Sequence, residues 1–368
     1  MKIIVSGGGT GGHIYPALTI IRAIKALEPT AEFLYVGTKR GLEADIIPKE
    51  GLNFVTVDLQ GFERHFTLSN IKRAGIAMIG VARAAGLVKE FEPDLAIGTG
   101  GYVCGPVLLA ASILRVPSMV QEQNVVAGIT NKLLSRFVSK VCVGMEEAAG
   151  NFPKDKTVYT GNPIRSEVMT ATREEGIKAL GLDAAKPTIL VSGGSRGARS
   201  INRAMIPVLR AAADDPSRQF VHVTGKDEYD DVLHRLKSVG VDLDASPRIK
   251  VFPYLYNMPQ ALAAADLAVF RAGAIGLAEL MARGVPSILI PYPYAAENHQ
   301  EHNALAAQNA GAARMILNKD LTPEILRQTI DELIGEPRRL EDMRAACRKL
   351  AKPEAAREIA ELALSLAK

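Results

Sequence analysis

The sequence predicts an α/β protein made of two doubly wound, Rossmann-like domains that face a central cleft. Its length of 368 residues exceeds one ordinary domain and suits two. Short β-branched segments alternate with longer helical patterns from the start of the chain, which is the order typical of a parallel sheet. One such segment in each half leads into a glycine-rich loop at the head of a helix, at residues 7–12 and 193–197.

The first domain is predicted over residues 1–163. Its strands are expected at residues 3–6, 33–36, 53–57, 95–97, 118–121 and 140–143, and its first helix at about residues 16–27. Residues 95–114 carry no charge over a length that could span a bilayer, but glycines and Pro106 interrupt them, which indicates a strand, a loop and a helix. After Lys2 the apolar run is too short for a signal peptide.

The second domain is predicted over residues 164–352. A turn-rich segment at residues 159–165 marks the boundary between the domains. A second series of strands is expected at residues 188–192, 219–224, 249–252, 267–270 and 287–290. The last stretch, residues 353–368, is rich in Ala and Glu, and we expect it to form a helix that packs back across the boundary.

The composition disfavours several classes of function. Lys and Arg number 44 against 40 Asp and Glu, and aromatic residues make up 5% with no Trp, so no nucleic-acid surface is predicted. Cys104, Cys142 and Cys347 are far apart, which suits a reducing compartment and gives no metal-ligand spacing. The sequence also lacks an H-E-x-x-H motif and a carboxylate cluster, so no metal site is expected.

The first glycine loop, Gly7 to His13, satisfies the G-x-G-x-x-G pattern that brings amides at a helix N-terminus close to a phosphate. An NAD site would place an acidic residue at the end of the second strand, where this chain has Gly37-Thr-Lys-Arg40. NAD is therefore disfavoured, while an NADP site using Lys39 and Arg40 stays open. The glycines could also serve only the close packing of strand and helix.

Further glycine loops follow strands at residues 98–106, 193–198 and 271–274. Ligands of open α/β sheets bind beyond the carboxyl ends of the strands, so we expect these loops to collect around one cleft between the domains. Arg271 and the helix amides after it are expected to face a diphosphate, and Glu279 to bind a ribose. A solvated helix acid is the alternative for Glu279. Ser192 and Ser195 have no His-Asp relay in the sequence, which disfavours a nucleophilic hydrolase.

Six motifs occur in the order seen in one family. They read GGGTGGHIYPA, GTGGYVCGP, QEQNVVAG, GNPIR, GGSRGAR and a block from RAGAIGLAE to ENHQEHNA. Over nearly its whole length the chain resembles the bacterial N-acetylglucosaminyltransferases that convert undecaprenyl-linked lipid I into lipid II in peptidoglycan synthesis. The resemblance implies a GT-B fold and an inverting hexosyltransferase that needs no metal or cofactor. It also implies a UDP-N-acetylglucosamine donor held mainly by residues 164–352, a lipid I acceptor met by residues 1–163, and a peripheral place on the cytoplasmic face of the cell membrane.

The resemblance also implies the residues of the site. Ser195 would lie at the diphosphate, Leu255 would contact uracil through its backbone, and Glu279 would bind the donor ribose. His13, at the exit of the first glycine loop, is the expected catalytic residue. The substrate-binding residues that it implies are Thr10, Gly11, Gly12, Asn124, Arg165, Ser195, Leu255, Arg271, Ala274, Glu279 and Gln300.

Three positions depart from the residues usual in that family. Gln121 stands where a His is frequent, Arg196 replaces a common Gln, and Gly276 replaces a residue with a hydroxyl group. The last change removes one expected phosphate contact. A hydrogen bond of this kind is worth on the order of 1 kcal/mol, which a helix amide or Arg196 could offset.

His13 is expected to act as the base. Transfer from an α-linked donor to a β-1,4 product inverts the anomeric carbon, so a single displacement by the muramyl hydroxyl suffices and one base is enough. A histidine, with an unperturbed pKa of ~6.5, suits that proton transfer. The alternatives are a positional role at the acceptor diphosphate or hydroxyl, a structural role in the loop, and a base supplied by Asn124 or Glu122.

Three other functions stay open on the sequence: a UDP-N-acetylglucosamine 2-epimerase of the same fold, an NADP oxidoreductase and a noncatalytic nucleotide-sugar sensor.

A membrane contact is predicted at residues 74–82, which are apolar almost all round a helix. They are flanked by Lys72, Arg73, Arg83 and Lys89, as a patch on anionic lipid would require. Burial of that helix between neighbours is the alternative.

Overall fold

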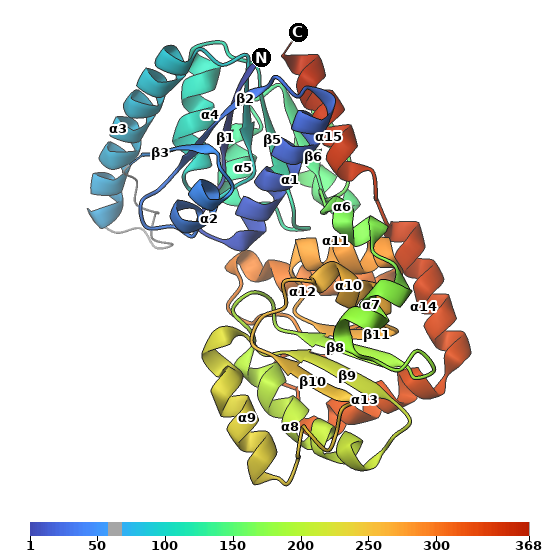
Figure 1. Cartoon of the computed structure of the whole chain (residues 1–368). Coiled ribbons are helices and arrows are strands. Elements are labelled where there is room, and N and C mark those ends of the chain that lie inside the picture. The colour runs from blue at the N-terminus through green and yellow to red at the C-terminus, as the bar shows by residue number, and fades with distance from the viewer. Residues whose placement is uncertain (58–67, 368) are drawn as a thin grey trace. The chain divides into compact units, whose positions relative to one another are not determined.

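The computed structural model describes the backbone of residues 1–57 and 68–367, and the side chains of residues 1–57 and 78–367 (Figure 1). The chain forms two compact units, Met1–Ile164 with Pro353–Lys368 and Arg165–Lys352. Each unit has its own parallel sheet with helices on both faces. The predicted α/β class with two doubly wound sheets is therefore confirmed.

The first unit is built on seven parallel strands in the order β3-β2-β1-β4-β5-β6-β7. The strands are β1 (Lys2–Ser6), β2 (Glu32–Gly37), β3 (Asn53–Thr56), β4 (Leu95–Gly98), β5 (Ser118–Glu122), β6 (Lys140–Val143) and β7 (Thr157–Tyr159). The helices are α1 (Gly11–Leu27), α2 (Glu43–Lys49), α3 (Leu68–Phe91), α4 (Cys104–Ile113), α5 (Ile129–Leu134), the 3-10 helix η1 (Glu146–Asn151) and α15 (Ala355–Leu366). Ser6 at the end of β1 pairs with Val36 of β2 and Gly98 of β4, so the loops after these three strands leave the same edge of the sheet.

Both faces of this sheet are buried, in the alternation that a strand imposes. Ile3 and Val5 of β1 pack into a core with α1 and α15, whereas Ile4 packs into a second core with α3 and α4. The C-terminal helix α15 lies along α1, and its fully buried Ala360 allows the two helices to approach closely. The last helix of the chain therefore completes a core of the first unit.

The second unit is built on six parallel strands in the order β10-β9-β8-β11-β12-β13. The strands are β8 (Thr188–Ser192), β9 (Gln219–Val223), β10 (Ile249–Phe252), β11 (Leu267–Phe270), β12 (Ser287–Leu289) and β13 (Ala313–Met315). Its helical elements are α6 (Ser166–Thr170), α7 (Arg173–Leu180), α8 (Arg199–Asp214), η2 (Lys226–Glu228), α9 (Tyr229–Ser238), α10 (Met258–Ala264), α11 (Ala274–Arg283), η3 (Ala296–Asn298), α12 (His299–Asn309), α13 (Pro323–Gly335) and α14 (Pro337–Leu350). The loops after β8, β9, β11 and β12 again leave one edge.

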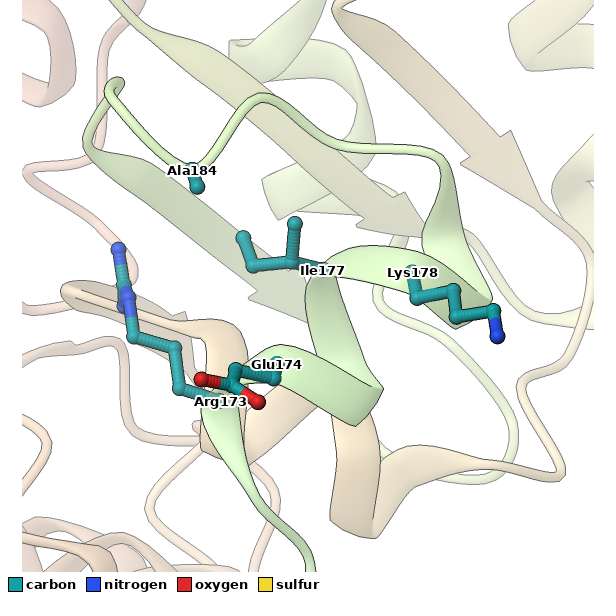
Figure 2. A pocket seen from close by; sticks show the side chains of 5 residues that line it. All are labelled: Arg173, Glu174, Ile177, Lys178 and Ala184. Carbon is teal, nitrogen blue, oxygen red and sulfur yellow. The ribbon is translucent and has the colours of Figure 1, made fainter.

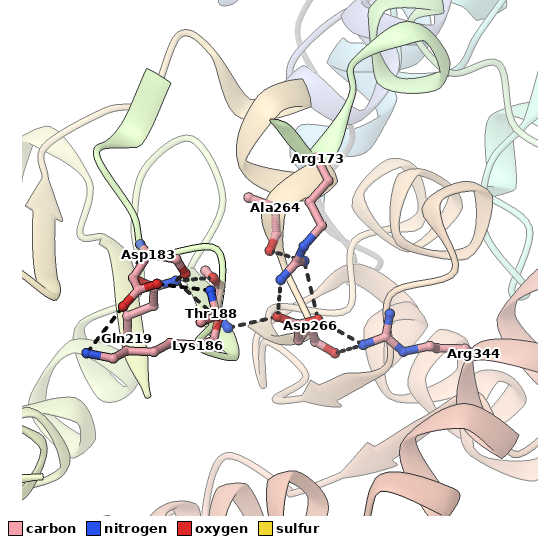
Figure 3. Close-up of polar contacts among 9 residues, drawn as sticks. Arg173, Asp183, Lys186, Thr188, Gln219, Ala264, Asp266 and Arg344 are labelled. Carbon is pink, nitrogen blue, oxygen red and sulfur yellow. Dashed lines mark hydrogen bonds and ion pairs between the residues drawn. The ribbon is translucent and has the colours of Figure 1, made fainter. Parts of the chain in front are cut away.

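The opposite, amino edge of this sheet is fixed by Asp266, which precedes β11 (Figure 3). Its carboxylate accepts hydrogen bonds from the Thr188 amide at 2.9 Å, from Arg173 at 3.0 and 3.3 Å, and from Arg344 at 3.1 Å. These charge-assisted bonds join the start of β8 and the start of β11 to α7 and α14.

A surface hollow of 380 Å³ lies on α7 (Figure 2). It is lined by Arg173, Glu174, Ile177, Lys178 and Ala184. Arg173 also binds Asp266 at the amino edge of the sheet, and no glycine loop contributes to this lining. The hollow therefore lies toward the amino edge of the sheet, whereas ligands of open α/β sheets bind beyond the carboxyl edge.

Within the described residues, no helix has the length and apolar character needed to cross a membrane. Residues 95–114 form β4, a glycine loop and α4, as the sequence predicts. Helix α1 begins at Gly11, five residues before the predicted start. Pro16 lies buried inside the helix.

Candidate functional site

The first glycine loop ends at an exposed helix N-terminus. Gly9 has φ of +84°, a left-handed conformation that favours glycine, and Thr10 is the N-cap of α1 with extended backbone. The Thr10 carbonyl accepts hydrogen bonds from the amides of His13 at 3.1 Å and Ile14 at 3.2 Å. The amides of the first helical residues have no acceptor within a helix, so this start of α1 can bind an anion.

The ring of His13 is held in one tautomer. Its Nδ1 lies 3.0 Å from the Thr99 carbonyl oxygen and 3.1 Å from Oε1 of Gln123. Gln123 points this oxygen at the ring because its Nε2 donates to Oε1 of Gln121 at 2.6 Å and to the Thr99 carbonyl at 2.7 Å. Since the Thr99 carbonyl can only accept, Nδ1 carries the proton and the neutral ring keeps its lone pair on Nε2. A half-buried imidazole in this form can accept a proton.

The loop after β4 packs directly on the first glycine loop. The Gly8 amide donates to the Gly100 carbonyl at 3.3 Å, and Oγ1 of Thr99 donates to the His13 carbonyl at 2.8 Å. A Cβ on Gly100 would lie 2.8 Å from Nδ1 of His13, and one on Gly101 would overlap the Gly8 carbonyl. The glycines after β4 therefore allow the close packing that fixes His13.

Glu122 is the last residue of β5, and Asn124 lies in the loop that follows. Oε1 of the buried Glu122 accepts from the Asn124 amide at 3.1 Å and from its side chain at 3.3 Å. Its other oxygen accepts from the Gly128 amide at 3.0 Å and from Asn131 at 2.9 Å. With four donors on its two oxygens, Glu122 holds this loop and the start of α5. These four bonds indicate a structural role for Glu122, and its role as a base stays an alternative.

The second glycine loop joins β8 to α8. Gly197 has φ of +75°, and a Cβ there would overlap the Thr224 carbonyl. A Cβ on Gly193 would overlap Ala198, the N-cap of α8. The loop is therefore tightly folded under its tip, where Ser195 is exposed. This loop leads into the N-terminus of α8, where helix amides can bind a phosphate, and the expected contact of Ser195 with the diphosphate stays a prediction.

Glu279 lies in α11 with only 6% of its surface exposed, so the alternative of a solvated helix acid is wrong. Arg165, the N-cap of α6, donates to its Oε1 twice, from Nε at 3.0 Å and from Nη2 at 2.9 Å. Burial raises the pKa of Glu279, and the Arg165 guanidinium opposes this rise. In the part of the chain that the structure describes, nothing donates to Oε2, which leaves this oxygen able to accept a ribose hydroxyl.

Arg271, after β11, is engaged with protein groups. Burial lowers its pKa to about 10. Its guanidinium donates, at 2.9 to 3.0 Å, to the carbonyls of Ile290 and Pro291 and to the side chains of Asn318 and Ser200. These bonds tie the ends of β11 and β12 to the start of α8. Its expected contact with the diphosphate stays a prediction.

The remaining predicted residues of the second unit lie on neighbouring loops. Leu255 is buried after β10, beside the exposed Tyr256. Gln300, in the first turn of α12, accepts from the Tyr292 amide at 2.9 Å. Ala274 is the first residue of α11 and presents its amide at that helix N-terminus.

The three residues that differ from those usual in the family contribute differently to the structure. Gln121 is buried and donates to Asn162 at 2.9 Å, which connects it to the chain of bonds that orients His13. Arg196 is exposed on the second glycine loop. A Cβ on Gly276 would meet only the Phe270 ring at 3.8 Å, so nothing in the structure explains the loss of a side chain there.

Two family models together match most of the chain. Residues 3–143 match the glycosyltransferase family 28 N-terminal domain, and residues 188–361 match the glycosyltransferase family 28 C-terminal domain. The chain belongs to glycosyltransferase family 28. The first match contains the glycine loops at residues 7–12 and 98–106, and the second contains those at residues 193–198 and 271–274. Membership in family 28 means that the NADP oxidoreductase hypothesis, which depended on Lys39 and Arg40, is wrong.

Relatives match this family 28 chain from end to end. A protein of Halalkalibacterium halodurans, 47% identical over 368 residues with 100% of both chains covered, is named UDP-N-acetylglucosamine–N-acetylmuramyl-(pentapeptide) pyrophosphoryl-undecaprenol N-acetylglucosamine transferase. The crystal structure of Acinetobacter baumannii MurG is 27% identical, with a TM-score of 0.78 and 99% of both chains covered. A UDP-GlcNAc 2-epimerase of Neisseria meningitidis bound to UDP-GlcNAc is 15% identical, with a TM-score of 0.68 over 99% of this chain and 100% of its own, and shares the fold alone. The resemblance predicted from the motifs is confirmed.

Sequence reasoning missed the side chains that hold these groups in place. Gln123 and Thr99 orient His13, Ser200 holds Arg271, and Glu43 lies under the first glycine loop. Only Glu43 had a signal in the sequence, since it is an acid shortly after the second strand. Among the described residues no cluster of His, Cys, Asp and Glu could hold a metal ion.

Proposed function

We propose that this family 28 chain transfers N-acetylglucosamine from UDP-N-acetylglucosamine to the muramyl 4-hydroxyl of lipid I, which forms lipid II in peptidoglycan synthesis. The observation that carries the proposal is that a relative named for this reaction is 47% identical and matches both units from end to end. The reaction inverts the anomeric carbon and uses no metal.

The second unit binds the donor in this proposal. Oε2 of Glu279 accepts from the ribose hydroxyls, and Arg165 keeps the carboxylate ionised and oriented. The amides at the starts of α8 and α11, with Ser195 and Ala274, meet the diphosphate. The Leu255 backbone contacts uracil. Gln300 and Arg271 hold the surrounding loops and complete the donor contacts.

The first unit supplies the base. The muramyl oxygen attacks the anomeric carbon, the bond from that carbon to the UDP oxygen breaks, and UDP leaves with the bonding electron pair. Nε2 of His13 takes the hydroxyl proton, because its Nδ1 proton is committed to the Thr99 carbonyl. Thr10, Gly11 and Gly12 at the start of α1, with Asn124, hold the acceptor. Helix amides that stabilise the leaving diphosphate lower the barrier further.

The test separates transfer from epimerisation. The protein is incubated with UDP-N-acetylglucosamine, with and without a lipid I analogue, and UDP release and the saccharide product are followed by mass spectrometry and chromatography. Transfer predicts UDP release and a disaccharide product only when the analogue is present. Conversion of the sugar nucleotide to its 2-epimer without acceptor would support the epimerase alternative, and no turnover would favour a nucleotide-sugar sensor.

We infer that the protein docks on the cytoplasmic face of the cell membrane through the first unit. Apolar side chains are exposed on α3, at Met78 and Ile79, on α5, at Leu133, and just after α5, at Phe137. Both α3 and α5 pack on α4. Exposed basic residues stand among them: Arg83, Lys132 and Arg136. Apolar side chains among basic ones suit an anionic lipid surface.

The structure describes the side chains of only part of the predicted patch at residues 74–82, from residue 78 onward. The side chains of residues 74–77, and of Lys72 and Arg73, lie outside the described residues. Met78 is 76% exposed and Ile79 is 55% exposed, which argues against burial of this turn of α3 between neighbours. Lipid contact at these two residues is part of the proposal.

A further inference from the structure

A buried carboxylate lies under the first glycine loop and takes no part in the proposed chemistry. Glu43, the first residue of α2, is 0% exposed. Its Oε2 accepts a hydrogen bond from the Gly9 amide at 2.9 Å. Its Oε1 accepts from Thr38 twice, from the amide at 3.0 Å and from the hydroxyl at 2.7 Å. No cation of the described residues forms an ion pair with Glu43, so these three donors stabilise the carboxylate.

Glycines make the space for this carboxylate. A Cβ on Gly8 would lie 2.5 Å from Oε1 of Glu43, and one on Gly37 would lie 2.6 Å from its Cγ. A Cβ on Gly41 would overlap the carboxylate itself. Gly37 is the last residue of β2, Gly41 follows that strand and Gly8 follows β1, so the chain after both strands is shaped around the same side chain. A buried acceptor surrounded so closely is held by its hydrogen bonds in one place.

The Gly9 amide, which donates to Glu43, belongs to the residue just before the N-cap of α1, Thr10. The neighbouring residues of the loop are also held, since Tyr35 donates to the Gly7 carbonyl at 2.6 Å and the Gly8 amide donates to Gly100. Burial raises the pKa of Tyr35 well above 10, which keeps this donor protonated. A side chain from α2 therefore holds the Gly9 amide, two residues before the first residue of α1.

We propose that Glu43 is a positioning residue for the acceptor site. Its carboxylate fixes the Gly9 amide and thereby the start of α1, where the acceptor is held and His13 takes the proton. Glu43 touches no substrate and acts through the backbone. The inference rests on the proposed function, because the acceptor site is the one that it serves.

A glutamine cannot take over this role. Its side chain offers one oxygen and one NH₂ group, whereas the site presents three donors to two oxygens. The NH₂ group would face either the Gly9 amide or Thr38, and that contact would push the loop from its present course. A purely stabilising role predicts something different, namely fewer folded molecules with normal kinetic constants in each.

The experiment compares the wild type with Glu43→Gln, Thr38→Val and a control, Asp94→Asn. The Asp94 carboxylate also accepts from a backbone amide, that of Lys2 at 2.8 Å, but at the amino edge of the same sheet. We measure kcat and KM for a lipid I analogue per folded enzyme, the Kd for UDP by calorimetry, the Tm, and hydrogen exchange over residues 7–14.

For Glu43→Gln we expect kcat/KM for the lipid I analogue to fall at least ~10-fold, faster exchange at residues 7–14, and a Kd for UDP within about twofold of the wild type. Thr38→Val, which removes one donor, should change the same quantities less, and Asp94→Asn should change none. Normal kcat/KM per folded Glu43→Gln enzyme, or an equal loss in Asp94→Asn, would overturn the inference.

Two further outcomes are also decisive. If Glu43→Gln does not fold, Thr38→Val decides, and unchanged acceptor kinetics in that variant count against Glu43 as a positioning residue. If the wild type transfers no sugar, the proposed function fails, and hydrogen exchange at residues 7–14 decides the inference by itself. Unchanged exchange in both variants would then reject it.

Discussion

Replacing Arg165 by Met should weaken UDP binding through Glu279. Arg165 makes two hydrogen bonds to one oxygen of a carboxylate that is 6% exposed, and methionine keeps most of the volume while removing the charge. Losing a charged acceptor for the ribose costs ~1.5–3 kcal/mol, or roughly 10- to 150-fold in Kd. The Arg165 side chain is 32% exposed, so water can replace part of its effect, and we expect the lower end, about 10-fold.

The pH dependence of UDP affinity shows whether Arg165 acts through Glu279. Burial raises the pKa of Glu279 and Arg165 opposes the rise, so removing Arg165 raises this pKa further. Ribose binding uses the ionised form, and UDP affinity should therefore fall as the pH drops through the pKa. In Arg165→Met this fall should begin at a higher pH than in the wild type.

Calorimetric titration with UDP at pH 6, 7 and 8 measures the effect, with Glu279→Gln as the control. The control should bind UDP weakly at every pH. A group with a raised folded-state pKa stabilises the protein below its unfolded pKa and loses this contribution as the pH rises through the folded value. At a pH above the folded-state pKa of Glu279, the Glu279→Gln variant should therefore unfold with no smaller a free energy than the wild type. If Arg165→Met loses affinity equally at all three pH values, Arg165 contacts UDP directly and the reasoning is refuted.

Three further predictions use other parts of the chain. His13→Ala should lower kcat at least ~100-fold with little change in the Kd for UDP, and a near-normal kcat in steady-state assays would remove His13 as the base. Ile79→Glu with Leu133→Glu should abolish binding to anionic liposomes in sedimentation assays while transfer to a soluble acceptor analogue persists; retained binding would exclude this surface. Burial lowers the pKa of His222 from 6.5 to about 4, so stability present above pH 6.5 should be lost as the pH falls toward 4, by about 3 kcal/mol in urea unfolding. A His222→Gln variant with the same pH dependence would contradict this assignment.

The strands of the sheet interiors were predictable because they are buried on both faces and read as continuous apolar segments. The strands β7 and β13 are absent from the prediction. Each has only three residues, lies at a sheet edge and is partly exposed, so its apolar signal is weak. Helix α2 was also missed, since its seven residues are too few to show a helical period and include Pro48.

The positions of the site loops were predictable, but the contacts within them were not. Glycine loops after strands indicate the carboxyl edge of a parallel sheet wherever they occur in the chain. The bonds that orient the functional groups join residues far apart in sequence: Nδ1 of His13 meets Thr99 across 86 positions, and Arg165 meets Glu279 across 114. Such pairs depend on the closed tertiary structure, and no local pattern marks them.

The position of α15 affects how the protein folds while it is being synthesised on the ribosome. Residues 1–164 are synthesised first, yet the core around α1 contains Ile359, Ala360 and Ala363, which emerge last. The unit of residues 165–352 is continuous and can close its core while the earlier unit still exposes apolar surface along α1. The first unit therefore closes its core only after the second has been synthesised, and the nascent chain must keep that surface from aggregating until residues 355–366 have been made.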